Sequence, residues 1–387
     1  EPVFGLELSV RLIVLAIPPL TAAGLLMIAQ VVHGRLPPTA PLALVFAYSF
    51  PFHFGFANFC LSVALSLIAF ALWRWLAIKG RFGLRAALFL PLSLILWVVH
   101  TFGWGVLGVL AYAAEMVRHR DEGKGWLKAW WQAAWDMLPL IPPILLMILW
   151  RPGQVGGRTA DWFNWHQKYR WLYMMLRDRW EVFDIACVFL LSLVIMAAIG
   201  FMVWDLVFRA PERRRVDFSR MLAMFAIFLA LVFLCLPRIV FGSAYADMRL
   251  APYAFAMGLL AIRFLPAVKT DALRWIAIAS LAFFLVRTGA TTASFLMFDR
   301  VYDRELQALE HVPEGARLAS FTGIACSQPW KMSRLEHLPG PGRHFHAGHP
   351  GHRSHRLDAL HLAQPSCDGH RHHQHTAGQR LMPIAIE

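Results

Sequence analysis

The chain has 387 residues, of which 58% are hydrophobic and 16% charged, and its formal net charge is +13. Soluble domains are about 45–50% apolar and about 25% charged, so this composition excludes an ordinary soluble domain and indicates a polytopic membrane protein. The apolar runs are continuous rather than alternating, which favours helices over a β-barrel. The basic residues lie in short loops between these runs, which is the positive-inside pattern rather than a nucleic-acid-binding surface.

Apolar runs of membrane-spanning length recur along the chain. A bilayer core requires about 20 helical residues. The stretches 41–78 and 84–117 are each too long for one crossing and carry polar residues near the middle, so each predicts a helical hairpin. The sequence thus predicts an all-α polytopic protein with about ten spans and short interfacial helices. The predicted spans are 10–32, 40–52, 56–77, 84–99, 102–118, 128–150, 182–208, 218–237, 250–267 and 273–291. The second is short for a crossing and is expected to be a half-helix or a re-entrant segment.

Loop charge predicts the orientation of these spans. Basic residues concentrate on one face, which we take as cytoplasmic, at Arg35 and in the segments 74–85, 118–128, 209–220 and 263–274. The outer face then holds the hairpin turns, the long loop 151–181 and everything after about residue 292. Because the outer loops are larger and chemically more varied, we expect any functional site there.

The loop 151–181 contains a candidate interfacial helix. One helical face would carry Leu172, Met175, Leu176 and Trp180. The segment is interpreted either as an anchoring helix with aromatic residues in the acyl boundary, or as a site where Lys168 and Arg170 bind a lipid-linked phosphate. The loop carries more basic residues than the positive-inside rule leads us to expect on the outer face. This excess supports the second interpretation.

Three charged residues at the outer membrane boundary are further candidates for substrate contact. Asp247 and Arg249 open the ninth predicted span, where they form either an ion pair or helix cap, or a substrate-facing pair. Arg287 lies in the tenth predicted span near its outer end. Its side chain either extends to the interface or faces a polar cavity.

His53, Asn58 and His100 lie at the two hairpin turns. They are either solvated or bonded to open backbone groups, or they line a polar pocket between the spans. These residues are too few to predict a metal site, and the five cysteines show neither metal-ligand spacing nor a disulfide framework. No cofactor is therefore predicted, and a divalent metal has no support in the sequence.

Composition divides the chain into three parts. Residues 1–292 form the predicted transmembrane domain, and residues 293–338 are expected to begin a small outer-face segment that is cut short. Residues 339–387 are rich in His, Pro and Gly without periodicity. We interpret this tail as disordered or out of frame rather than as a physiological metal-binding tract.

Two motifs carry a resemblance to a known family. They are Phe54-Gly55-Phe56-Ala57-Asn58-Phe59, followed by Leu61-Ser62-Val63-Ala64-Leu65, and Tyr245-Ala246-Asp247-Met248-Arg249-Leu250-Ala251-Pro252. Over residues 1–325 the chain resembles poorly characterised bacterial multipass proteins that are similar to GT-C-type glycosyltransferases. The resemblance implies a bacterial inner membrane location and a polyprenyl-phosphate sugar as donor. In that family the catalytic carboxylate usually lies in the first outer loop, which we expect to precede this chain. Glu7 and Asp247 are the candidates within it.

The leading hypothesis is a GT-C-like glycosyltransferase that takes a sugar from a lipid-linked donor at the outer face, with membrane lipid and a polyprenyl-phosphate sugar as partners. A multipass transporter is the alternative, because the short segment 40–52 and the prolines Pro139, Pro142 and Pro143 provide the helix breaks that transporter sites use. A membrane protein without catalytic activity is the third option. The sequence indicates no oligomeric state.

Overall fold

The long apolar runs of the sequence form long helices in this computed structural model, which describes residues 5–149, 157–307 and 330. By length and composition, five of the described helices are suited to crossing a membrane. They comprise Leu8–His33, Ala57–Ile78, Phe82–Val99, Glu181–Phe208 and Thr270–Arg304. The prediction of a helical protein with membrane-spanning helices is therefore confirmed at this level.

Seven predicted spans correspond to single helices. These are α1 (Gly5–His33), α4 (Ala57–Ile78), α5 (Phe82–Val99), α6 (Thr101–Asp121), α10 (Glu181–Phe208), α11 (Arg220–Cys235) and α13 (Thr270–Gln307). The hairpins predicted for 41–78 and 84–117 turn close to the expected positions, after His53 and at His100. The last helix is much longer than its predicted span, because no proline or glycine pair interrupts it after residue 291.

Two other predicted spans are broken helices. The segment 40–52 forms α2 (Ala40–Leu44), the 3₁₀ turn η1 (Val45–Tyr48) and α3 (Phe50–His53), with a proline in the first turn of both α2 and α3. The segment 128–150 forms α7 (Trp126–Asp136), η2 (Leu138–Leu140) and α8 (Pro142–Leu149). Proline lacks the backbone N–H that a helix interior needs, so each break falls where prolines occur.

The ninth predicted span needs correction, and one short strand pair accompanies the mostly helical fold. Helix α12 (Ala251–Ala261) ends well before residue 267, and the chain continues as strand β2 (Ile262–Phe264). This strand pairs antiparallel with β1 (Val216–Phe218), which follows η3 (Pro211–Arg213). The pairing satisfies backbone groups that the short helix leaves open, and burial of Val216 and Ile262 holds the ribbon against the helices.

Small residues allow the central helices to approach closely. Helix α1 packs against α4, and α4 packs against α6. A Cβ atom on Gly24 would lie 2.6 Å from the Leu67 Cβ, and one on Gly103 would lie 2.6 Å from the Ser62 Cβ. The Ser66 hydroxyl also donates to the Gly103 carbonyl oxygen at 2.7 Å. Close approach through glycine and serine is the packing mode expected where lipid offers no hydrophobic driving force between helices.

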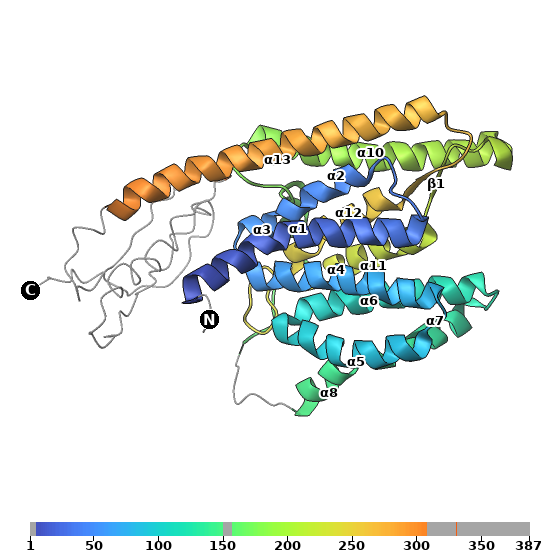
Figure 1. Ribbon diagram of the computed structural model, residues 1–387, viewed down its shortest axis with the longest axis horizontal. Coiled ribbons are helices and arrows are strands. Elements are labelled where there is room, and N and C mark those ends of the chain that lie inside the picture. Colours follow the sequence, from blue (N-terminus) through green and yellow to red (C-terminus); the bar gives the residue numbers. More distant parts are fainter. Residues whose placement is uncertain (1–4, 150–156, 308–329, 331–387) are drawn as a thin grey trace, which may run out of the picture. The chain divides into compact units, whose positions relative to one another are not determined.

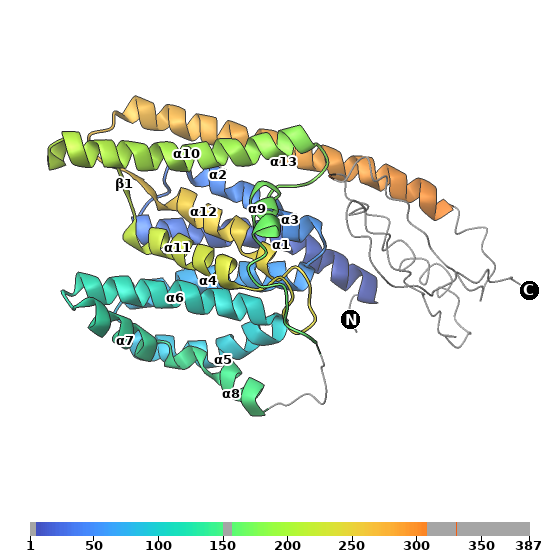
Figure 2. The same ribbon diagram turned by 180° about the vertical axis from the view of Figure 1, so that it is seen from behind.

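The helices run lengthwise beside one another, so their turns gather at two ends (Figures 1 and 2). We call one the basic end, because it holds the basic loops after α1, α4, α6, α10 and β2. The other, the hairpin end, holds the turns before α4 and α6 and the loop between α11 and α12. The hairpin end therefore brings both predicted hairpin turns to the same side of the molecule as the loop that leads to Arg249.

Contacts divide the chain into two units, Glu1–Met297 with Trp330–Met332, and Phe298–Pro329 with Ser333–Glu387. The hairpin end and the basic end both belong to the first unit. Within the predicted segment 293–338, residues up to Gln307 continue α13, and Trp330 packs in the first unit. The remainder of that segment and the predicted tail 339–387 lie outside the described residues.

Candidate functional site

A tightly folded loop between α11 and α12 presents the candidate site at the hairpin end. Ile239 pairs with Ala160 in an isolated bridge, which ties this loop to the segment before α9 (Trp165–Tyr173). Phe241 and Tyr245 have φ angles of 49° and 62°, the left-handed conformation of a sharp turn. The loop ends in the 3₁₀ turn η4 (Asp247–Arg249), directly before α12.

Arg249 is a buried cation that no carboxylate neutralises within the described part of the chain. It is only 3% exposed. Its Nη2 donates to the Ser243 hydroxyl at 3.4 Å and to the Ala244 carbonyl oxygen at 3.3 Å, both long hydrogen bonds. Its Nε has no hydrogen-bond partner among the residues that the structure describes. A guanidinium has five N–H donors, so most of the hydrogen-bonding capacity of Arg249 is unused.

Aromatic rings surround the Arg249 guanidinium. Its Cζ lies 4.0 Å from the ring centroid of Phe56, and the rings of Phe59 and Phe102 lie 5.6 and 5.5 Å away. These rings come from the turns that begin α4 and α6. Cation–π contact stabilises the charge in part, but it replaces neither the water nor the counter-ion that burial removes. The arrangement therefore favours binding of an anion.

His100 lies beside the same group of rings and caps α6. Its Nδ1 accepts a hydrogen bond from the backbone N–H of Phe102 at 3.1 Å, and its ring meets that of Phe59 edge-on at 5.9 Å. Burial, followed by the charge of Arg249, lowers the pKa of His100 to about 4. The imidazole is thus neutral at pH 7, and since Nδ1 is an acceptor, Nε2 carries the proton. Asn58 lies exposed in the first turn of α4.

Asp247 pairs with Lys168 rather than with Arg249. The Lys168 ammonium donates to the carbonyl oxygens of Phe233 and Leu236 at 2.7 and 2.8 Å and contacts Asp247 Oδ2 at 3.4 Å. Burial raises the pKa of Asp247, although the Lys168 charge acts in the opposite direction. Because all three donors of Lys168 are occupied, the geometry favours a role in holding α9 against α11 and η4.

The proposed interfacial helix in loop 151–181 is shorter than the sequence suggested. Helix α9 ends at Tyr173, so Met175 and Leu176 lie beyond it, and both are buried. Arg170 is half-buried in α9, and no ion pair of its side chain occurs among the residues described. The prediction that Lys168 and Arg170 act together on a phosphate remains a prediction, but the structure gives the two side chains different surroundings.

Arg287 belongs to a second buried cluster. Its Nη1 lies 2.5 Å from Asp184 Oδ1, and its Nη2 donates to the Leu176 carbonyl oxygen at 2.6 Å. The other Asp184 oxygen accepts from the Trp330 indole N–H and the backbone N–H of Asp178, both at 2.9 Å. This carboxylate therefore compensates the buried Arg287 charge, and the cluster fastens α13 to α10.

His53 lies at the edge of this second cluster. Its Nδ1 is 3.9 Å from Asp178 Oδ1, which also accepts from the Ser294 hydroxyl at 2.9 Å. Both histidine and carboxylate side chains are fully buried. The structure thus places Arg249 and His100 in one group and Arg287 and His53 in another, and it pairs Lys168 with Asp247.

Sequence reasoning missed Asp178, Asp184 and Ser294. The sequence does contain a signal for this cluster. Asp178 and Asp184 lie at the start of a long apolar run, and Arg287 and Ser294 lie seven residues apart on one helix face. Glu7, the other catalytic candidate, lies in the first turns of α1, and its side chain is outside the described residues.

Near the basic end, Glu115, His119 and Asp136 have ligand atoms within 4.8 Å of one another. Cations already surround these groups. Glu115 pairs with Arg85 and Arg118, both at 2.6 Å, and Arg118 also contacts Asp136 at 2.7 Å. The charges are therefore balanced by protein groups. The arrangement favours an ion-pair network that links α5, α6 and α7 over a metal centre.

The fold defines a helical protein with helices suited to a membrane. Comparisons with protein-family models, characterised proteins and solved structures find no match for this chain. The resemblance to GT-C-type glycosyltransferases therefore remains a prediction from sequence.

Proposed function

We propose that this chain binds the phosphate of a lipid-linked sugar at Arg249 and acts as a GT-C-like glycosyltransferase in a bacterial inner membrane. The observation that carries the proposal is the buried Arg249 guanidinium with its unused donors and without a described carboxylate partner. A phosphate matches it in charge and in hydrogen-bonding geometry. The surrounding Phe56, Phe59 and Phe102 rings suit an amphiphilic ligand, since they would contact apolar parts of the donor next to its phosphate.

The chemical step would be a displacement at the anomeric carbon of the sugar. The acceptor hydroxyl oxygen forms a bond to this carbon while the bond from the carbon to the phosphate oxygen breaks. The lipid phosphate leaves with the electron pair, and Arg249 stabilises its negative charge. A general base takes the proton from the acceptor hydroxyl. Asp247 shares η4 with Arg249 and is the candidate for this base within the described chain.

The proposal also includes the number of times that the chain crosses the membrane. Five described helices are long enough to cross a bilayer, and α6, α11 and the broken segments run between the same two ends. We propose that these elements complete about ten passages, several of them by short or discontinuous helices, as the predicted hairpins require.

Binding of farnesyl phosphate to the purified full chain tests the phosphate site. Arg249→Met should weaken binding by about 10–150-fold, as expected for a lost charge-assisted contact of about 1.5–3 kcal/mol. Arg238→Met is the matched control, because this cation lies at the same end but has its own partner in Asp161 at 3.5 Å. Equal affinity of the Arg249→Met variant and the parent would eliminate the site.

Thermal stability separates a ligand-binding role from a structural one. Removing a buried charge that lacks a counter-ion relieves a desolvation cost, so Arg249→Met should melt at the same or a higher temperature than the parent. A lower melting temperature with unchanged farnesyl phosphate binding would show that Arg249 serves the fold. Sugar transfer from a panel of polyprenyl-phosphate donors then tests the chemistry, and absence of turnover across the panel would contradict the transferase.

A transporter is the second candidate because the structure contains two discontinuous segments, α2-η1-α3 and α7-η2-α8. Breaks of this kind line the substrate sites of many secondary transporters. Reconstitution in liposomes with an imposed ion gradient distinguishes the two functions. Gradient-dependent solute flux would favour transport, whereas donor-dependent glycosyl transfer without flux would favour the transferase.

A further inference from the structure

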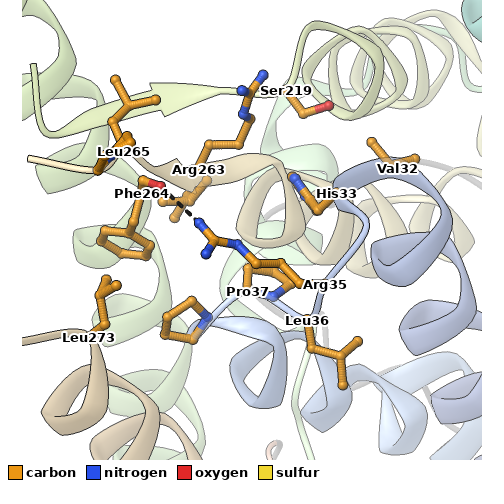
Figure 3. A pocket seen from close by; sticks show the side chains of 13 residues that line it. Val32, His33, Arg35, Leu36, Pro37, Ser219, Arg263, Phe264, Leu265 and Leu273 are labelled. Carbon is orange, nitrogen blue, oxygen red and sulfur yellow. Dashed lines mark hydrogen bonds between the residues drawn. The ribbon is translucent and has the colours of Figure 1, made fainter. Parts of the chain in front are cut away.

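A second cationic pocket lies at the basic end, away from the hairpin-end site. It has a volume of about 360 Å³, within the range of small-molecule sites. Its walls come from the end of α1, the segment leading to α2, strand β2 with the loop after it, and the start of α13. Figure 3 shows the side chains of His33, Arg35 and Arg263 around the same space.

The charge in this pocket has one sign. Arg35 and Arg263 line it together with His33, and none of the lining residues in the described chain carries a carboxylate. The Arg35 guanidinium makes one long hydrogen bond, at 3.4 Å, to the Phe264 carbonyl oxygen. Asp217 lies opposite Arg263 in the strand register but does not line the pocket. The guanidinium donors are thus available to an anion.

A serine at the start of α11 adds a polar group to the pocket wall. Ser219 lines the pocket and is 5% exposed. It occupies the N-cap position of the 16-residue helix α11, yet its side chain makes no capping hydrogen bond. A serine hydroxyl that makes no capping bond can donate to a ligand oxygen in the pocket. The N-terminus of α11 adds positive potential at the same point.

The apolar part of the wall identifies the form of the anion. Leu36, Leu265 and Leu273 line the pocket beside the cations. The pocket also lies where two candidate spans meet the basic loops, namely the end of Leu8–His33 and the start of Thr270–Arg304. An amphiphile bound here would have its polar group at the membrane interface and its acyl chains beside these helices. We propose that this pocket binds the phosphate group of an anionic membrane lipid, independently of the hairpin-end site.

Thermal unfolding of the purified full chain in non-ionic detergent tests this assignment. The probe is dihexanoyl phosphatidic acid, and dihexanoyl phosphatidylcholine and inorganic phosphate are the comparison ligands. The melting temperature should rise saturably with the phosphatidic acid and much less with either of the others. An equal rise with inorganic phosphate would overturn the lipid assignment, and absence of any rise with phosphatidic acid would overturn the site.

Paired variants locate the effect. Arg35→Gln/Arg263→Gln should weaken the apparent affinity for phosphatidic acid by about 30-fold, since each basic residue near an anionic lipid contributes a factor of about five. Lys79→Gln/Arg81→Gln removes two exposed cations from another loop of the same end and should leave affinity unchanged. Equal losses in both pairs would show a general surface-charge effect and contradict the pocket.

Ser219→Ala keeps the test informative if the double arginine variant folds poorly. Because the Ser219 side chain makes no capping hydrogen bond to the described start of α11, the variant should melt like the parent without lipid. Its affinity for phosphatidic acid should fall by about five-fold, the value of one neutral hydrogen bond. Unchanged affinity in this variant would contradict a ligand phosphate beside Ser219.

Discussion

Three buried cations at the hairpin end differ in what compensates their charge. Lys168 has two carbonyl oxygens and a carboxylate, and Arg287 has a carboxylate and a carbonyl oxygen. Arg249 has aromatic faces and two long contacts. Described protein groups thus compensate two of these charges, whereas Arg249 keeps donors for a ligand. This contrast between neighbouring cations is the reason for assigning ligand binding to Arg249.

The pKa of His100 leads to a prediction for stability at acid pH. The folded-state pKa is about 4, whereas the ordinary value is 6.5. Between these values the unfolded chain takes up a proton that the folded imidazole does not, so stability should fall as pH decreases from about 6.5 to about 4. His100→Asn keeps a capping acceptor but cannot titrate. Melting curves at pH 7 and pH 4.5 should show a smaller loss in the variant, by about 1 kcal/mol after allowance for partial exposure.

One outcome of this experiment would contradict the prediction for His100. Other groups titrate over this range and contribute equally to both proteins, so only the difference between parent and variant reports on His100. If the two proteins lose stability in parallel, His100 is not held neutral by its surroundings.

Two glycines of α6 provide a matched pair for testing the packing of α4 against α6. A Cβ atom on Gly103 would collide with the Ser62 side chain, whereas no atom of the described residues lies within 4 Å of one on Gly105. Gly103→Ala should therefore destabilise the protein by about 1–3 kcal/mol through overpacking. Gly105→Ala should be neutral or stabilising by about 0.5–1 kcal/mol, the usual gain in a helix. Thermal unfolding in detergent gives both values, and a loss of stability in Gly105→Ala as large as that in Gly103→Ala would refute the close contact.

At the scale of elements, apolar length predicted the single helices well and indicated that 40–52 is too short for a regular crossing, but it predicted 128–150 as one span rather than a broken helix. Runs such as 182–208 contain no proline, so length and hydropathy decide the outcome. Segment 128–150 contains prolines that favour a break. Its length and its average hydropathy nevertheless favour a single span. Strand β2 was not predictable, because its pairing with β1 depends on a contact between segments about 45 residues apart.

Lys168 connects elements that are distant in sequence, which leads to a prediction for stability. Lys168→Met should destabilise the protein by about 3–5 kcal/mol, because it leaves a buried carboxylate and two carbonyl oxygens without a donor. Arg170→Met, on the same helix, removes a half-buried cation without a described ion pair and should cost less than about 1 kcal/mol. Chemical unfolding in detergent measures both.

A double variant tests the reason for the loss. Adding Asp247→Leu to Lys168→Met removes the stranded carboxylate, so the double variant should be more stable than Lys168→Met alone. Additive losses would show that the two side chains do not interact, and the link between α9 and η4 would then rest on other contacts.

For the whole molecule, the sequence predicted that the candidate residues lie on one side of the membrane. It did not predict which of them lie next to one another. Loop charge and span alternation were enough to bring His53, His100, Arg249 and Arg287 to the same end. Their division into two groups depends on partners such as Asp184 and Phe56, which lie far away in sequence. Burial of those partners is a tertiary property that a single sequence does not contain.

The gathering of the basic loops at one end predicts the orientation of the whole protein. By the positive-inside rule, the basic end should face the cytoplasm and the hairpin end the outside. With the five native cysteines replaced, Lys79→Cys reports on the basic end and Tyr169→Cys on the hairpin end, and both positions are exposed. A membrane-impermeant maleimide should label Tyr169→Cys in intact cells and Lys79→Cys only after lysis. The reverse pattern would invert the orientation, and it would place Arg249 on the cytoplasmic side, where an outer-face donor could not reach it.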